Sequence, residues 1–348
     1  MGDLSGALTA VQMALRLRNE LSWIHPDTAS YIHFLGVINF EMGDLKAAAE
    51  ELQRAASMRR ELLGEHEATA CSYHYLGVAQ GYMRDHDAAL ISLQKALDMR
   101  RKLLGAHAET ARTFNTLGTL HLTMGAVNLA FEVLQNAVYM RTHLLGDHED
   151  TATSYLRLGE AQLEIGDHNG AFGSVQKSLQ LRQKLLGDHP DTAESIHVLG
   201  RVYFAMHDNK VALEKFQTAL NMRSKLLGKH EDTAYSYFHR GEVQMEMGDF
   251  KEAVESFQKS LQLCQELLGN HTHTATIFFF LGLAYFTLGD TSLALTSLQK
   301  AADMRSQLLG SHENTVCSYQ WLAEVQDSVG DHNGAIESWK KAFEFAGV

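Results

Sequence analysis

Residues 64–105 read GEHEATACSYHYLGVAQGYMRDHDAALISLQKALDMRRKLLG and contain one complete copy of a unit that recurs along the chain. A fixed period of this length is the signature of stacked repeats, in which each unit buries its apolar face against its neighbours. The length of the chain therefore counts repeats instead of compact domains. The closing Leu-Leu-Gly returns every 41 residues, without insertion or deletion, at Gly64, Gly105, Gly146, Gly187, Gly228, Gly269 and Gly310.

Each unit contains two helical patterns. Within residues 189–206, apolar residues recur three or four positions apart, which is the spacing of one helix face, and residues 249–268 show the same spacing. Pro26 and Pro190, the only two prolines, directly follow a repeated histidine, as expected for the first residue of a helix. The second pattern opens with aspartate in eight of nine copies, a preferred N-cap residue. Each unit is therefore predicted to be a hairpin of helix A followed by helix B.

The repeated histidine precedes helix A in eight units. The first amides of a helix have no partner within the helix, so we predict that the imidazoles are structural N-caps. Packed helices lie about 8–10 Å apart, so equivalent histidines cannot easily share a metal ion, and we expect no metal site. The eight predicted caps are His25, His66, His107, His148, His189, His230, His271 and His312.

Two further positions are fixed within the helices. Glycine recurs in the middle of helix A, as at Gly77, although it costs about 1 kcal/mol relative to alanine there. We expect helix B to approach closely at its recurrent alanine, such as Ala89. An arginine near the end of helix B is expected to be structural, beside exposed carbonyls and paired with acids of the next unit. These arginines are Arg18, Arg59, Arg100, Arg141, Arg182, Arg223 and Arg305.

Composition excludes several classes of function. The formal net charge of -12 disfavours binding to nucleic acid or to an anionic membrane surface, since both require a basic face. No apolar run is long enough to span a membrane, and the amino-terminal residues lack the pattern of a signal peptide. Cys71, Cys264 and Cys317 are too few and too scattered for a disulfide framework, which favours free thiols and a cytoplasmic location.

The fixed positions resemble a known family. Tyr73 is followed by Leu76-Gly77 in helix A, and helix B carries Ala89, Leu93 and Ala96. This spacing resembles the W-x2-L-G-x2-Y…A-x3-F…A signature of tetratricopeptide repeats (TPR). The long unit is similar to the repeats of kinesin light chains and to the TPR arrays of some STAND-class NTPases, although no P-loop occurs in this chain. The resemblance implies an all-α, right-handed solenoid that binds proteins.

The period places the repeat boundaries. We predict a single array over residues 1–348, which begins with a half repeat formed by helix B alone (1–24) and ends with a capping repeat (312–348) whose last helix lacks Leu-Leu-Gly. The seven full repeats between them are 25–65, 66–106, 107–147, 148–188, 189–229, 230–270 and 271–311.

The variable positions of helix A carry the prediction of a binding site. The resemblance implies that residues around the helix-A Leu-Gly face a concave groove, which here would be rich in aromatic residues and histidine. We expect a peptide with some acidic character near Arg112, Arg157 and Arg201, while any one aromatic residue could instead pack against the next repeat. The predicted groove residues are His33, Phe34, His74, Tyr75, Arg112, Asn115, Thr116, Arg157, His197, Arg201, Phe238, His239, Phe279, Phe280 and Trp321.

Three functions remain open from the sequence. No nucleophile, acid–base or metal motif appears, so we predict that the chain is not an enzyme and needs no cofactor. The favoured function is a scaffold for a protein or peptide ligand. One alternative is the ligand-sensing repeat domain of a larger STAND-type signalling protein. The other is a structural solenoid that self-associates by homotypic stacking through its N-terminal half repeat, where apolar Leu8, Val11 and Leu15 would be partly uncovered.

Overall fold

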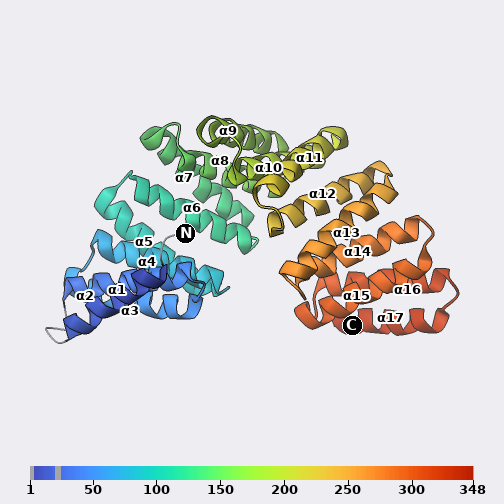
Figure 1. The fold of residues 1–348 in the computed structure, drawn as a ribbon, viewed down its shortest axis with the longest axis horizontal. Helices are drawn as coiled ribbons and strands as arrows, with labels where there is room; N and C mark the ends of the chain where they lie inside the picture. The colour runs from blue at the N-terminus through green and yellow to red at the C-terminus, as the bar shows by residue number, and fades with distance from the viewer. Residues whose placement is uncertain (1–3, 20–24, 348) are drawn as a thin grey trace. The chain divides into compact units, whose positions relative to one another are not determined.

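The computed structural model describes residues 4–19 and 25–347, and the only regular structure within these ranges is α-helix. The predicted all-α repeat fold is therefore confirmed (Figure 1). The helices are α1 Leu4–Asn19, α2 Pro26–Glu41, α3 Leu45–Leu63, α4 Glu67–Tyr82, α5 His86–Leu104, α6 Ala108–Thr123, α7 Val127–Leu145, α8 Glu149–Glu164, α9 His168–Leu186, α10 Pro190–Ala205, α11 Asn209–Leu226, α12 Glu231–Met247, α13 Phe250–Leu267, α14 Thr272–Thr287, α15 Thr291–Leu309, α16 Glu313–Ser328 and α17 His332–Ala346.

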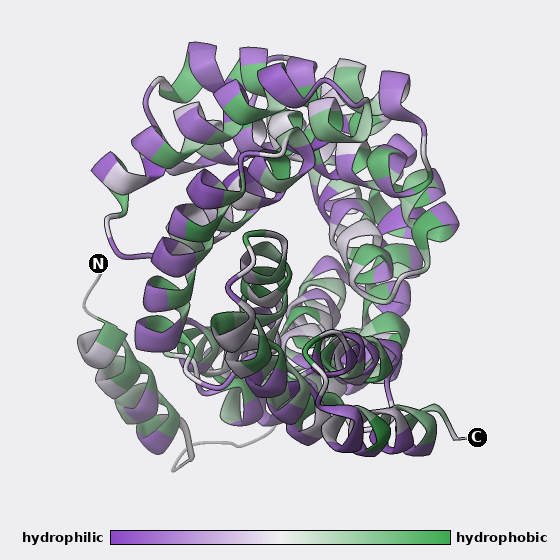
Figure 2. Cartoon of the chain, turned by 90° about the vertical axis from the view of Figure 1, so that its right-hand side faces the viewer, coloured by the Kyte–Doolittle hydropathy of each residue, from purple (hydrophilic) through white to green (hydrophobic). Residues whose placement is uncertain are grey.

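The chain divides into two compact units, residues 1–181 and 182–348. Within each unit, helices that are consecutive in the chain pack against one another, as α4 does against α3 and α5. In the order of the repeat, the even-numbered helices are A helices and the odd-numbered helices from α3 onward are B helices. Figure 2 shows hydrophobic and hydrophilic residues interleaved along the helices, as expected for helices that bury one face. None of the described helices is long and apolar enough to cross a membrane.

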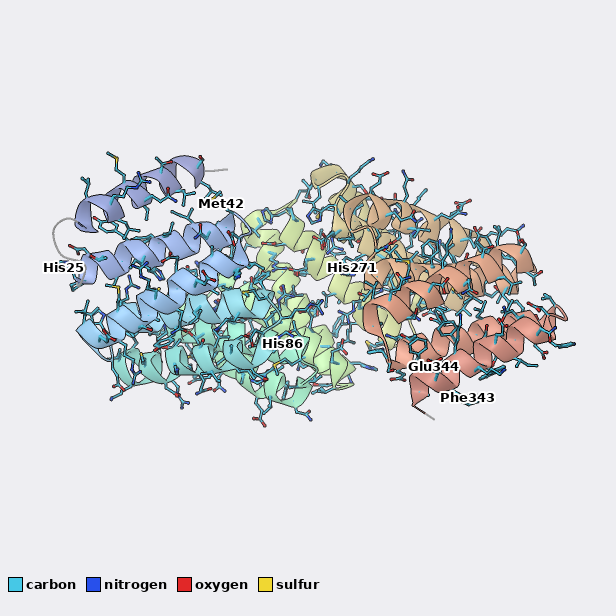
Figure 3. All side chains as sticks on the ribbon, turned by 90° about the horizontal axis from the view of Figure 1, so that it is seen from below. His25, Met42, His86, His271, Phe343 and Glu344 are labelled. Carbon is cyan, nitrogen blue, oxygen red and sulfur yellow. The ribbon has the colours of Figure 1, made fainter. Side chains whose placement is uncertain are left out.

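Histidine is the N-cap residue of each A helix from α2 to α16. Nδ1 of each of the eight histidines accepts a hydrogen bond from the backbone N–H two residues later, at 3.1 Å for His25 and 3.2 Å for His271. Figure 3 labels His25 and Met42 at the two ends of α2. The residues described include no group of three or more His, Cys, Asp and Glu that could hold a metal ion.

Glycine in the middle of helix A admits a large side chain from helix B. A Cβ built on Gly77 would lie 2.6 Å from Leu93 Cγ, and one on Gly118 would lie 2.4 Å from Leu134 Cγ. Helix B approaches closely at its recurrent alanine, as predicted, since the same Cβ on Gly77 would lie 3.1 Å from the carbonyl oxygen of Ala89; the side chain four positions after the alanine lies closer still. An added methyl group would push two well-packed helices apart.

Helix B ends at the Leu-Leu-Gly glycine because the chain needs a positive φ there. Gly64 has φ +65° and ψ -134°, a conformation that side chains with a Cβ rarely adopt. The turn then leads directly into the histidine cap of the next A helix. This connection sets how one repeat follows another.

Candidate functional site

The contact between helix B of one repeat and helix A of the next is termed here a repeat joint, and most joints contain the recurrent arginine. At the joint between α3 and α4, Arg59 donates from Nη1 to the carbonyl oxygen of Ala68 at 2.8 Å and to Ser72 Oγ at 2.8 Å. Ser72 Oγ lies 3.2 Å from Nδ1 of His33 on the preceding A helix, α2. One serine therefore links three helices.

Five other joints have the same chemistry. The arginine donates to the Oγ of a serine or threonine thirteen residues later, at 2.8 Å for Arg100 to Thr113 and 3.0 Å for Arg182 to Ser195. Acids of the next repeat also pair with some of the arginines, as expected, but carbonyl and hydroxyl oxygens are the recurrent acceptors. The side chain of Arg18 lies outside the described residues. The remaining pairs are Arg141 with Ser154, Arg223 with Ser236, and Arg305 with Ser318.

Three of the predicted groove histidines belong to these joints instead of an open surface. His33, His74 and His197 are buried, and each has Nδ1 within 3.5 Å of a serine or threonine hydroxyl of the next A helix. Burial, and secondarily the charge of Arg59, lowers the pKa of His33 to about 4. Burial together with Arg100 and Arg112 lowers the pKa of His74 to about 3, and burial also places the pKa of His197 well below its usual value. The prediction that these three histidines line an accessible groove is therefore wrong.

Two predicted groove aromatics are also buried. Phe238 makes edge-to-face contact with Phe280 at 5.3 Å between ring centroids, and Phe279 lies under the guanidinium of Arg305 at 4.8 Å from its ring centroid. Both side chains fill space between consecutive A helices, at the position that His33 occupies in its own repeat. For these residues the packing alternative is correct, because their position in helix A points toward the next helix.

The other predicted groove residues keep solvent access. Phe34 is the most open of the aromatics, with 54% of its surface exposed. The set also contains two arginines whose charge is partly compensated within their own helix: Arg157 Nη1 lies 2.7 Å from Glu160, and Arg112 Nη2 lies 3.3 Å from Glu109. The partly buried residues of the set are Tyr75, Arg112, Asn115, Thr116, Arg157, Arg201, His239, Phe280 and Trp321.

A pocket of about 450 Å³ opens between the A helices α4 and α6 of the first unit. Its base includes the buried side chains of Leu93 and Leu120. Two of the predicted groove residues, Asn115 and Thr116, line this pocket. Asn115 Oδ1 accepts a hydrogen bond from Ser154 Oγ at 3.0 Å. The lining residues, defined here as the α4–α6 pocket, are Gly77, Val78, Gly81, Tyr82, Leu93, Asn115, Thr116, Thr119, Leu120 and Thr123.

Sequence reasoning missed most of this pocket. Gly81, Val78 and Thr119 were not among the predicted groove residues, which are mostly large or charged side chains close to the Leu-Gly. A signal was nevertheless present, since Gly81 interrupts a column of large apolar residues in the repeat alignment. Whether a missing side chain leaves a space depends on how the neighbouring helix packs beside it, and the sequence alone does not give that packing.

Comparison with known proteins identifies the repeat. The family model described as tetratricopeptide repeat matches residues 27–102, 69–135, 109–173, 166–225 and 232–307. A search of curated proteins finds no match.

Solved structures with similar folds include both kinds of protein that the unit resembles, together with a third protein. BtubC (BKLC) from P. vanneervenii has a TM-score of 0.54 and 18% identity, over 64% of this chain and 88% of that chain. A kinesin light chain of Podosopora anserina, with nearly identical TPR-like repeats, has a TM-score of 0.51 and 23% identity, over 58% and 98% of the two chains. A STAND protein with a tetratricopeptide repeat sensor from Pyrococcus horikoshii has a TM-score of 0.64 and 12% identity, over 90% and 50%. At these identities the likeness concerns the fold alone.

Proposed function

Because the chain belongs to the tetratricopeptide repeat family, whose members typically mediate protein–protein interaction, we propose that it is a non-catalytic scaffold that binds a peptide or an extended segment of a protein partner along its A helices. The carrying observation is that several A-helix side chains retain solvent access while their neighbours one residue away fill the repeat joints. Phe34 is exposed beside buried His33, and Tyr75 is only partly buried beside buried His74. Exposed aromatic residues in a row are common anchors in peptide recognition.

The charges on the A helices favour a partner segment of low net charge. Arg112 and Arg157 each have a carboxylate within 3.3 Å and 2.7 Å respectively, and His239 Nδ1 lies 2.5 Å from Glu242. Because these pairs are already formed, a strongly acidic peptide would have to compete with the carboxylates of the chain itself. Three free cysteines suit a reducing compartment, so we propose that the protein acts in the cytoplasm.

The proposal is tested by selecting binders from a displayed library of random twelve-residue peptides against the full chain. We expect at least tenfold weaker binding of the selected peptides to the Phe34→Ala or Phe280→Ala variants. Tyr139→Ala is the matched control, since Tyr139 is an exposed aromatic on a B helix, α7. Peptides that lose affinity for Tyr139→Ala and keep it for the A-helix variants would refute the proposed surface.

A further inference from the structure

We propose that the α4–α6 pocket is an anchor site for one large apolar side chain of the partner, such as phenylalanine or leucine, within an uncharged part of the bound segment. This inference rests on the function proposed above and identifies where on the A helices the partner is held. It is supported by a gap left by a missing side chain at one position of the repeat and by the chemistry of the pocket wall.

The gap lies at Gly81. Other A helices carry a large apolar residue at the equivalent position, and this side chain packs toward the next A helix. Leu122, for example, contacts a cluster that includes Leu158 and Ala161 of α8, and Met245 contacts one that includes Leu281 of α14. In this array the usual occupant of such a space is therefore an apolar side chain. The residues equivalent to Gly81 are Phe40, Leu122, Leu163, Phe204, Met245 and Phe286, with Asp327 in the last repeat.

The space beside Gly81 is open in the folded chain. A Cβ built there would meet only one atom within 4 Å, Leu120 Cδ1 at 3.8 Å, whereas a Cβ on Gly77 of the same helix would lie 2.6 Å from Leu93. Thr116 on the facing helix widens the space further, because the equivalent residues in the flanking repeats are the longer Tyr75 and Arg157. Two exceptions to the repeat thus coincide at one place.

The wall of the pocket suits an uncharged ligand. None of the residues that line it is Asp, Glu, Lys, Arg or His. The hydroxyls of Thr116, Thr119 and Thr123 donate to carbonyl oxygens of their own helix at 3.1, 3.0 and 2.8 Å, so these hydrogens are already used. The pocket volume of about 450 Å³ is within the range of ~300–1,000 Å³ typical of sites for small ligands. One apolar side chain would gain from burial here at little cost to polar groups.

The decisive variant is Gly81→Leu, which restores the residue found at this position in α6 and α8. Because a Cβ fits there and leucine favours helix over glycine, the midpoint of urea unfolding should stay the same or rise. Binding of peptides selected on the wild-type chain should nevertheless weaken at least tenfold, and one apolar residue in each peptide should be indispensable. Gly173→Leu is the matched control, since a Cβ on Gly173 of α9 meets nothing within 4 Å and this residue does not line the pocket.

A second measurement uses toluene, the small-molecule analogue of the phenylalanine side chain, and methyl NMR of the full chain. We expect toluene to shift the methyl resonances of Thr116, Thr119 and Leu120 in the wild type and in Gly173→Leu, and to leave them unchanged in Gly81→Leu. Absence of these shifts in the wild type would overturn the anchor site. Selected peptides that bind Gly81→Leu with unchanged affinity and still depend on Phe34 or Phe280 would overturn it as well, while leaving the proposed function intact. Peptides indifferent to every A-helix variant would overturn both.

Discussion

The joint between α5 and α6 and the joint between α13 and α14 occupy the same place in the repeat and are built from opposite chemistry. In the first, Arg100 is only 1% exposed and donates to Thr113 Oγ1 and to the carbonyl oxygen of Glu109. In the second, Cys264 and Ile277 occupy the arginine and hydroxyl positions, and both are buried. The second joint therefore has apolar residues at both the arginine position and the hydroxyl position.

The preceding A helix also differs between these two joints. His74 approaches Thr113 at the polar joint, whereas Phe238 occupies the equivalent position at the apolar joint and contacts Phe257 and Phe280 with ring centroids 5.7 and 5.3 Å apart. A buried charge is tolerated only when each partner is present, and a well-packed apolar group of similar volume can replace the complete set. The difference teaches that the arginine and the hydroxyl are exchanged together, whereas the residue on the preceding A helix varies, since Phe279 lies beside Arg305 at a polar joint.

Breaking the polar joint on one side should have the largest effect. Arg100→Cys introduces the residue found at the apolar joint, but leaves Thr113 Oγ1 without its arginine donor and the carboxylates of Glu67 and Glu109 without the cation that lies 2.9 Å from each. We expect a loss of about 3–5 kcal/mol in the free energy of unfolding, measured by urea denaturation. Arg101→Cys on the exposed face of the same helix is the control and should change stability little. Equal losses in the two variants would contradict the role assigned to Arg100.

Acid should weaken the polar joints next most strongly. The folded-state pKa values of His33 and His74, about 4 and about 3, lie below the unfolded value near 6.5, so the unfolded chain binds more protons in this range. Their stabilising contribution is present above pH 6.5 and is lost as the pH falls toward the folded values. Between pH 7.5 and pH 5 we expect a loss of about 2 kcal/mol for each histidine, measured by urea unfolding.

The comparison between the joints supplies the control for this pH dependence. His74→Phe copies Phe238 and removes one titrating group, so the acid-induced loss should shrink by about the contribution of one histidine. An unchanged pH dependence in His74→Phe would show that His74 does not titrate as described.

Completing the exchange should give the smallest effect. Adding Thr113→Ile to Arg100→Cys reproduces two of the three residues of the apolar joint, so the double variant should be more stable than the sum of the single losses by about 1 kcal/mol. Residues in direct contact commonly couple by roughly this amount in a double-mutant cycle. Strict additivity would mean that Arg100 and Thr113 act independently.

Much of the fold could be predicted from the sequence because the same pattern of residues recurs in each repeat, so a helix that is unclear in one copy is clear in the others. Histidine at the start of helix A has its hydrogen-bond partner only two residues away, so its place in the pattern is sufficient to predict its contact. His33 meets Ser72 at a separation of 39 residues, and that contact depends on how one hairpin packs on the next. Adjacent residues on a helix point in different directions, so the pattern alone could not separate buried His33 from exposed Phe34.

The α4–α6 pocket could not be predicted for a related reason. Sequence patterns draw attention to side chains that are present, whereas this site arises from a side chain that is absent at Gly81. Its volume depends on the small residues that the facing helix presents at Thr116 and Thr119. Periodicity predicts which residues are equivalent, and packing then determines which exceptions create space.

The residue at the hydroxyl position of each joint also sets rules for losing or duplicating repeats. Removal of residues 66–106 would bring Arg59 into register with Thr113, so a donor would again meet a hydroxyl. Removal of residues 230–270 would bring Arg223 into register with Ile277, and a buried cation would face a hydrocarbon side chain. Although every unit has the same length, only some pairs of units are compatible neighbours. The order of the repeats is therefore itself under physical constraint, and the array can change its length freely only where both new neighbours carry the same kind of joint.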